Sequence, residues 1–301
     1  MGPQSQNLKA YLLLITGTWG WGCNVIFGKL AVGHIMPMQL VTARWLGVTL
    51  LLLLFARKYI IRDWPVLRTR LLYVTLMGSA GFTAFNALFY LAAYRTSAIN
   101  IGILQGSIPV FVLLGSFLLF RFRVSPLQAL GVAATLLGVI TVATRGDLQL
   151  LLDFAFNFGD LFMLMACFLY ASYSIGLSRR PAVSALGLFT AMAVVAFVGS
   201  LPLLAIETVQ QGFTPPSLQG WVVAGLVTLL PSFLSQVFFI RGVELIGAER
   251  AGVFINLVPV FASVMAVLVL HEQIHLFQLV ALGLVLGGIA LSEKGKRQAP
   301  G

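Results

Sequence analysis

The chain has 301 residues, of which 59% are hydrophobic and only 9% are charged, and its formal net charge at pH 7 is +10. Soluble domains carry roughly 25% charged residues, so this composition excludes an ordinary water-soluble domain and predicts an all-α polytopic membrane protein. The basic excess is explained more fully by membrane topology than by nucleic acid, and we expect no nucleic-acid partner.

Ten apolar runs, each about long enough to cross a bilayer as a helix, follow one another between charged or Pro/Gly-rich breaks. The first run has only Lys9 before it, and nine more follow, so we predict a retained helix rather than a signal peptide. Cys23 and Cys167 lie inside apolar runs and indicate no disulfide framework. The runs cover approximately residues 9–32, 38–56, 70–93, 98–120, 127–144, 158–178, 183–206, 219–242, 249–270 and 276–292.

The distribution of basic residues predicts how the helices are oriented. With a cytoplasmic N-terminus, Lys29, Arg95 and Arg145 fall outside, Arg44 falls within the second helix, and the rest of the 19 Lys and Arg residues fall inside. Because cytoplasmic loops are enriched in Lys and Arg, the sequence predicts that both termini are cytoplasmic.

The two halves of the chain resemble each other. SIPVFVLLGSFLL at 107–119 recurs as LVPVFASVMAVLV at 257–269, 150 positions later. Each half holds five helices, and because five is odd the second half enters the membrane from the opposite side, which is an inverted-topology repeat. We predict a first five-helix repeat at 1–150, a second, inverted repeat at 151–293 and a cytoplasmic tail at 294–301.

Four stretches resemble a known family of transporters. TWGWGCNVIFGK at 18–29 is similar to the first-helix motif of the EamA-type branch of the drug/metabolite transporter superfamily. SAINIGILQGSIPVF and GAERAGVFINLVPVF resemble its fourth and ninth helices, and HEQIHLFQLVALGLVLGGIAL resembles its usual ending. Length and aromatic content are also similar to YddG-type aromatic amino-acid exporters of bacteria. The resemblance implies a multi-pass transporter of the bacterial inner (plasma) membrane, whose central cavity opens alternately to each side.

Polar and aromatic side chains at helical spacing predict how such a cavity is lined. Amides can bond an ammonium or a carboxylate, while ring faces stack on an aromatic side chain. The alternative is that the aromatics face lipid or neighbouring helices and that the amides join helices to one another. The candidate substrate-binding residues are Trp21, Asn24, Phe82, Asn86, Phe89, Tyr90, Gln105, Tyr170, Tyr173, Ser235, Gln236, Phe239 and Asn256.

The charge pattern favours a neutral or zwitterionic cargo. All nine acidic residues fall at or near helix ends or in loops, and a carboxylate at mid-membrane costs roughly 2.5–3.5 kcal/mol. Arg44 is the one basic residue well inside a span, and we expect it to snorkel or cap a helix end. With no buried carboxylate expected, the sequence predicts facilitative export of small metabolites, aromatic amino acids being favoured. Proton-coupled transport of another metabolite or drug is the alternative.

The repeated prolines predict where the helices bend. Pro109 and Pro259 remove backbone donors near mid-membrane, and Gly102 and Gly252 precede them at matching places. These four residues are the candidate conformational hinges. Ten helices can enclose a cavity in one chain, so we expect a monomer whose partners are a small-molecule substrate and the lipid bilayer.

A His-Glu-x-x-His spelling at 271–275 raises an enzymatic alternative. On a helix, this spacing holds zinc between two histidines and uses the glutamate as general base, which would make His271, Glu272 and His275 an intramembrane zinc protease. The motif falls between two apolar runs, so we predict a turn, no enzyme, no metal and no cofactor. A passive channel would need charge rings or a filter, and a scaffold would need a soluble domain; the sequence shows neither.

Overall fold

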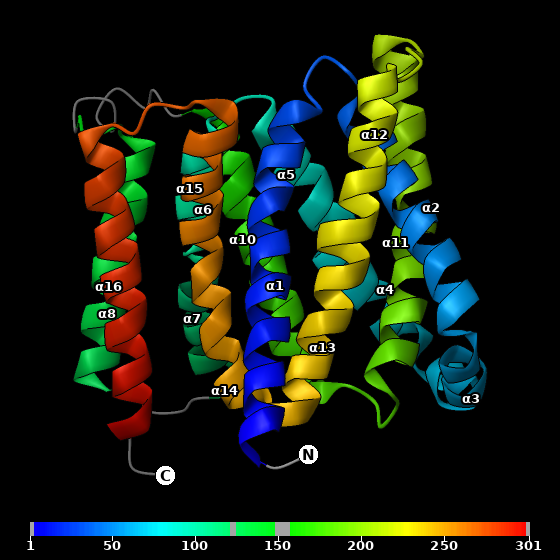
Figure 1. Ribbon diagram of the computed structural model, residues 1–301, viewed down its shortest axis with the longest axis horizontal. Coiled ribbons are helices and arrows are strands. Elements are labelled where there is room, and N and C mark those ends of the chain that lie inside the picture. The colour runs from blue at the N-terminus through cyan, green and yellow to red at the C-terminus, as the bar shows by residue number, and fades with distance from the viewer. Residues whose placement is uncertain (1–2, 121–124, 148–156, 299–301) are drawn as a thin grey trace.

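The computed structural model describes residues 3–120, 125–147 and 157–298, and within these residues every element of regular secondary structure is a helix. Ten helical segments are long and apolar enough to cross a membrane, as the sequence predicts. They run side by side, and both chain termini lie at the same end of the bundle (Figure 1). We call this the termini end and the other the far end. That the termini end is cytoplasmic stays a prediction.

The first half contains five of these spans. α1 (Pro3–Leu30) and α2 (Pro37–Phe55) are continuous helices. The third span joins α4 (Leu71–Gly78), the π-helical turn η2 (Ser79–Ala84) and α5 (Phe85–Ala93). The fourth is divided into α6 (Ala98–Gln105) and α7 (Ile108–Phe120), and the fifth is α8 (Pro126–Ala143).

The second half repeats this arrangement. The sixth span is α10 (Phe158–Gly176), followed by η3 (Leu177–Arg179), and the seventh is α11 (Ala185–Gln211). The eighth joins α12 (Leu218–Val227), the π-helical turn η4 (Thr228–Leu234) and α13 (Ser235–Ile246). The ninth joins α14 (Ala248–Gly252), η5 (Val253–Leu257) and α15 (Val258–Leu270), and the tenth is α16 (Leu276–Gln298).

Local irregularities follow the repeat as closely as the helices do. α7 and α15 begin and end 150 positions apart, at 108–120 and 258–270. The π-helical turns at 79–84 and 228–234 fall at equivalent places in the third and eighth spans. Pro109 and Pro259 each lie in the first turn of a helix, where the missing N–H is tolerated. The inverted repeat is therefore visible in the backbone itself.

One element differs from the sequence prediction. Residues 57–69, read as a loop, form α3 (Arg57–Leu67) and the start of the 3-10 turn η1 (Arg68–Arg70), and α3 lies at the termini end (Figure 1). The helix exposes Ile61 and Trp64 while its flanks are rich in arginine and lysine. This is the pattern of a helix that lies along a membrane interface. The seventh and eighth helices also extend further than predicted, to Gln211 and Ile246. Most of the predicted 145–157 loop lies outside the described residues.

Glycines set how closely the helices approach. α8 and α16 pack along their lengths, and a Cβ on Gly131 would lie 2.7 Å from the backbone nitrogen of Ser292. Small residues that let backbones approach are the usual means of packing helices in lipid. Large apolar side chains such as Leu54, Leu72 and Leu118 are about three-quarters exposed, as expected for a surface that faces lipid.

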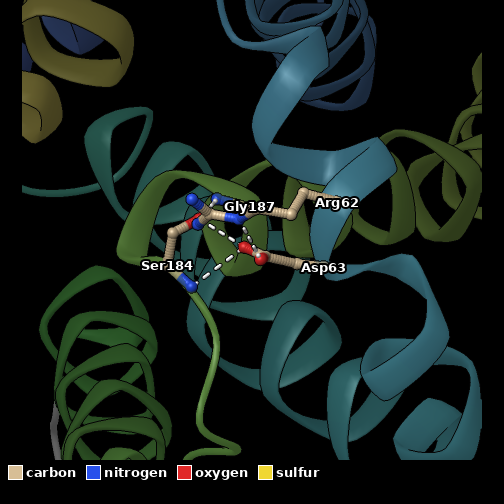
Figure 2. A network of polar contacts seen from close by, with 4 residues as sticks. All are labelled: Arg62, Asp63, Ser184 and Gly187. Atoms are coloured by element: carbon tan, nitrogen blue, oxygen red, sulfur yellow. Dashed lines mark hydrogen bonds and ion pairs between the residues drawn. The ribbon is translucent and has the colours of Figure 1, made fainter.

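Buried carboxylates cap helix N-termini at both ends of the bundle. At the termini end, Asp63 of α3 accepts hydrogen bonds from the backbone N–H (2.9 Å) and the hydroxyl of Ser184, the N-cap of α11 (Figure 2). Ser184 Oγ in turn accepts from the Gly187 N–H at 3.0 Å. At the far end, Glu207 near the end of α11 accepts from Met38 and Gln39 at the start of α2. The repeat-related helices α2 and α11 are thus capped at opposite ends of the bundle, α2 by Glu207 of α11 and α11 by Asp63 of α3.

Candidate functional site: a central cavity between the two repeats

A cavity in the middle of the bundle is lined by residues from both halves. It has about 900 Å³ of empty space, including its opening. Its wall is mainly aromatic and aliphatic, with a few amides, one serine and one arginine. It is lined by Trp21, Asn24, Arg44, Trp45, Gly81, Phe82, Phe85, Asn86, Phe89, Gln105, Gly106, Ile108, Pro109, Tyr170, Phe189, Pro231, Ser232, Gln236, Ile255, Asn256, Val258, Pro259 and Ile289.

Most of the predicted site residues are brought together here. Trp21, Asn24, Phe82, Asn86, Phe89, Gln105, Tyr170, Gln236 and Asn256 line the cavity. Four others do not line it. Tyr90 and Tyr173 are buried behind its wall, and Ser235 is buried against the glycines of α1. Phe239 contacts the ring of Trp21, with centroids 5.0 Å apart and planes inclined by 45°. These four shape the cavity from outside it.

The aromatic wall is continuous. Trp45 lies flat on Phe82, with ring centroids 4.7 Å apart and planes 12° apart, and Phe189 meets the same ring edge-on at 5.8 Å. Phe85 continues the wall to Tyr170 at 5.0 Å. Such pairs stabilise one another beyond their buried area, so the wall is a preformed surface for a flat apolar group.

The two π-helical turns face the cavity from opposite repeats. Phe82 lies in η2, and Pro231 and Ser232 lie in η4. The wider π turn leaves backbone groups free, and the Pro231 carbonyl accepts a hydrogen bond of 3.0 Å from Trp21 Nε1. π-helical turns often occur at functional sites. The sequence analysis did not predict either turn; Gly81 lies in one and Pro231 in the other.

Arg44 corrects the expectation of a snorkelling side chain. It is only 6% exposed and lines the cavity instead of extending to the end of α2. Its Nη1 donates to Asn24 Oδ1 at 3.1 Å and to Tyr90 Oη at 2.7 Å. A central arginine costs roughly 2.5–3.5 kcal/mol to insert, and such residues mark substrate pathways.

The candidate hinges divide into two kinds. Pro109 and Pro259 line the cavity at the breaks of the fourth and ninth spans. Gly102 faces α15, where an added Cβ would lie 2.8 Å from Ala262 Cβ, whereas nothing lies within 4 Å of a Cβ built on Gly252. Gly102 therefore serves close packing, and hinge motion at any of the four stays a prediction.

Several carboxylates are buried, contrary to the sequence expectation. Asp63, Asp160 and Glu207 are 7%, 2% and 5% exposed. Asp160 Oδ1 accepts from Thr96 Oγ1 at 2.5 Å and lies within 3.5 Å of Asn100 Nδ2. All three lie toward an end of the bundle, where backbone or hydroxyl donors hold them, and none lines the cavity. Their position near helix ends is as the sequence predicts, but they are buried because neighbouring helices cover those ends.

Polar contacts between helices gather at the far end. Lys29 Nζ donates to the carbonyls of Ala93 (2.8 Å) and Thr96 (2.9 Å). Tyr94 Oη donates to the Ile35 carbonyl, and burial, with the charge of Glu207 nearby, raises the pKa of Tyr94 to about 12. The first, second and third spans are thereby tied together at this end.

The His-Glu-x-x-His segment lies at the far end as a turn. α15 ends at Leu270, His271 adopts a left-handed conformation with φ 54°, and α16 begins only at Leu276. Glu272 accepts from the Ala98 and Ile99 N–H groups at 2.8 and 3.1 Å and so caps α6. Within the described residues, no three His, Cys, Asp or Glu side chains are grouped to hold a metal. The helix that a zinc protease motif requires is absent from this segment.

A second, polar pocket opens beside this turn. It has about 1080 Å³ of empty space including open solvent, and its lining includes Lys29, Arg95, Arg145 and Glu272. The three basic residues assigned to the outside by their position in the sequence therefore line one vestibule.

Comparison with known proteins finds similarity to transporters over nearly the whole chain. A model of the EamA-like transporter family matches residues 8–144 and again residues 157–293. The chain is 25% identical over 296 residues to the uncharacterized transporter YyaM of Bacillus subtilis (strain 168), covering 94% of this chain and 93% of that protein. It is 24% identical over 300 residues to an uncharacterized transporter of Archaeoglobus fulgidus, covering 97% of this chain and 100% of that protein. A crystal structure superposes with a TM-score of 0.62 at 16% identity, over 96% of this chain and 99% of that chain, which shows the fold alone.

Proposed function

The chain belongs to the EamA-like transporter family, and we propose that it exports small amphipathic metabolites, aromatic amino acids above all, by alternating access. One observation carries this proposal: a cavity between the two repeats combines a continuous aromatic wall with amides and a single arginine. Sites for small molecules are mostly apolar, with a few polar groups that fix orientation. The likeness to YddG-type exporters stays a prediction, and so does the inner-membrane location.

The proposed movement is a rocking of the two repeats about the cavity. In this structure the hydrogen bonds of Glu207 and Glu272 join the two repeats at the far end. The cavity lining, by contrast, reaches Phe189, near the start of α11 at the termini end, and Asn256, in the half of the ninth span that begins at the termini end. This supports a conformer closed at the far end. Export would then require these far-end contacts to break, while further contacts between the repeats form at the termini end beside the one between Asp63 and Ser184.

We propose facilitative transport, driven by the substrate gradient. The lining residues include no Asp, Glu or His, so a proton has no carboxylate or imidazole to occupy beside the substrate. The buried Asp160 keeps a proton-coupled mechanism as the second candidate, because it lies near the far-end contacts and accepts from Thr96.

The test is counterflow in proteoliposomes loaded with unlabelled substrate. We expect saturable uptake of labelled phenylalanine, tyrosine or tryptophan, with no uptake of sugars or nucleotide sugars, and an unchanged rate when the pH gradient is abolished. A thermal unfolding transition first establishes that the purified protein is folded. If such protein shows no counterflow with any aromatic amino acid, the substrate assignment is refuted. Uptake that occurs only with an imposed pH gradient would favour the Asp160 mechanism, which Asp160→Asn should then abolish.

A further inference from the structure

We propose that Arg44 is the anchor for a carboxylate of the transported molecule, so that the substrate must carry a carboxylate but need not carry an amine. The inference rests on the proposed transport function and names the chemical class that its site accepts. It also sharpens the expectation of a neutral or zwitterionic cargo, because it admits simple organic anions.

The charge of Arg44 is buried without a counter-ion. The side chain is 6% exposed, and none of the residues that line the cavity with it is Asp or Glu. Its two hydrogen-bond acceptors, Asn24 Oδ1 and Tyr90 Oη, are neutral. Buried charges are normally paired, and an anionic group of the substrate is the partner that the cavity lacks.

The geometry of the guanidinium leaves one edge for a ligand. Both hydrogen bonds start from Nη1, and Nε is buried with no hydrogen-bond partner. Nε and Nη2 form the parallel pair of donors that binds a carboxylate through two oxygens. Asn24 and Tyr90 therefore hold the group by one nitrogen, and the edge suited to a carboxylate stays unused by the protein.

The surroundings of Arg44 fit an apolar body attached to that carboxylate. The guanidinium carbon lies 5.4 Å from the ring centroid of Trp45, which stacks on Phe82. A substrate whose carboxylate bound the unpartnered edge of Arg44 would place its apolar part against this wall. For further polar groups the cavity offers only neutral partners, hydroxyls such as that of Ser232 and amides such as Asn86 Oδ1 and Gln105 Nε2, the last two without a partner. An ammonium would find no charge to pair with, so it is the dispensable group.

The charges of the vestibule at the far end also favour a negatively charged substrate. Lys29, Arg95 and Arg145 line it beside the single carboxylate of Glu272. Clefts lined by one sign of charge raise the local concentration of oppositely charged molecules. A vestibule of this sign would guide an anion rather than an amine.

The experiment compares three probes that share a phenyl ring. Counterflow and thermal stabilisation of the purified protein are measured with phenylalanine, with 3-phenylpropanoate, which lacks the amine, and with phenethylamine, which lacks the carboxylate. We expect the wild type to accept the two carboxylates and to bind phenethylamine about tenfold to a hundredfold more weakly, the range of a charge-assisted hydrogen bond. Equal binding of phenethylamine and phenylalanine would overturn the proposal without any variant.

Variants separate anchoring from a structural role. Arg44→Gln should remove the preference for carboxylates over phenethylamine, and Arg44→Lys should keep part of it, because it retains the charge without the two-pronged edge. Tyr90→Phe, which removes one neutral partner, should keep the preference. If Arg44→Gln is destabilised but retains the wild-type ratio between probes, Arg44 is structural and the proposal is wrong.

The outcomes also distinguish this inference from the proposed function. Stabilisation by 3-phenylpropanoate that depends on Arg44, with no counterflow of any amino acid, would refute amino-acid export and keep the anchor. Counterflow of aromatic amino acids that is unaffected by Arg44→Gln would keep the function and refute the anchor. If no carboxylate probe stabilises the folded wild type, the anchor is refuted.

Discussion

Removing the carboxylate of Asp63 tests how strongly the termini end of the bundle is held. Asp63 accepts two hydrogen bonds from Ser184, one from its N–H at 2.9 Å and one from its hydroxyl. Its ion pair with Arg62 Nε at 3.0 Å involves an arginine side chain that is 63% exposed. We therefore expect the hydrogen bonds to Ser184 to contribute much more to the free energy of unfolding than the ion pair with Arg62.

The magnitude follows from these contacts. Hydrogen bonds to charged groups contribute about 1.5–3 kcal/mol, and a half-buried N–H left without a partner adds to the loss. Ser184 Oγ still caps Gly187 in the variant, so we expect Asp63→Ala to lower the free energy of unfolding by about 2–3 kcal/mol. The exposed ion pair is worth at most about 1 kcal/mol, so Arg62→Ala is the matched control.

The assay is thermal unfolding of the purified protein in one detergent, at a fixed heating rate. A loss of 2–3 kcal/mol corresponds to a fall of roughly 4–12 °C in the midpoint, whereas Arg62→Ala should shift it by less than about 4 °C. Asp63→Asn, which keeps one acceptor oxygen, should fall between them. Equal shifts for Asp63→Ala and Arg62→Ala would show that the cap at α11 contributes nothing and would refute this reasoning.

Three further predictions concern the far end, the topology and the helix packing. Glu272→Gln should destabilise the fold by about 1–2 kcal/mol, because an amide caps the start of α6 more weakly than a carboxylate; an unchanged thermal midpoint would contradict this. A cysteine introduced at the exposed Gln273 should react with a membrane-impermeant maleimide in intact cells, whereas one at the exposed Arg179 should react only after permeabilisation. Both native cysteines are buried and should give little background. The reverse labelling pattern would show that the predicted orientation is inverted. Gly288→Leu should reduce folded yield severely, since even a Cβ there would lie 2.8 Å from the backbone nitrogen of Thr135; normal yield in a detergent screen would show that α8 and α16 can separate.

Much of the fold could be read from the sequence because lipid imposes a simple rule. A segment that crosses the bilayer must be helical and apolar over about 20 residues, so all ten spans were predicted. Their bounds differ by four to six residues at the start of the first helix and at the ends of the seventh, eighth and tenth. α3 was missed because an interfacial helix is amphipathic and rich in Arg and Lys. By hydropathy alone such a segment looks like a loop.

The site was predicted only in part. Spacing along single helices found amides and rings such as Asn86 and Phe82, which line the cavity. The spacing also selected Tyr90 and Phe239, which do not line the cavity. A helix face turned toward the bundle interior contacts either the cavity or another helix, and spacing does not distinguish the two. Trp45 and Phe189 line the cavity but were not predicted to do so. Both lie within apolar runs, where the sequence does not distinguish a ring that faces the cavity from one that faces lipid.

The sequence by itself determined the class of protein, the number of spans and the repeat, because these follow from hydropathy and from identities 150 positions apart. Only the tertiary structure decided where the charges lie. Arg44 reaches the cavity, and Asp63, Glu207 and Glu272 each cap a helix distant in sequence. A buried charge is stable only with the donors or acceptors around it, and those come from helices that the linear sequence does not place side by side.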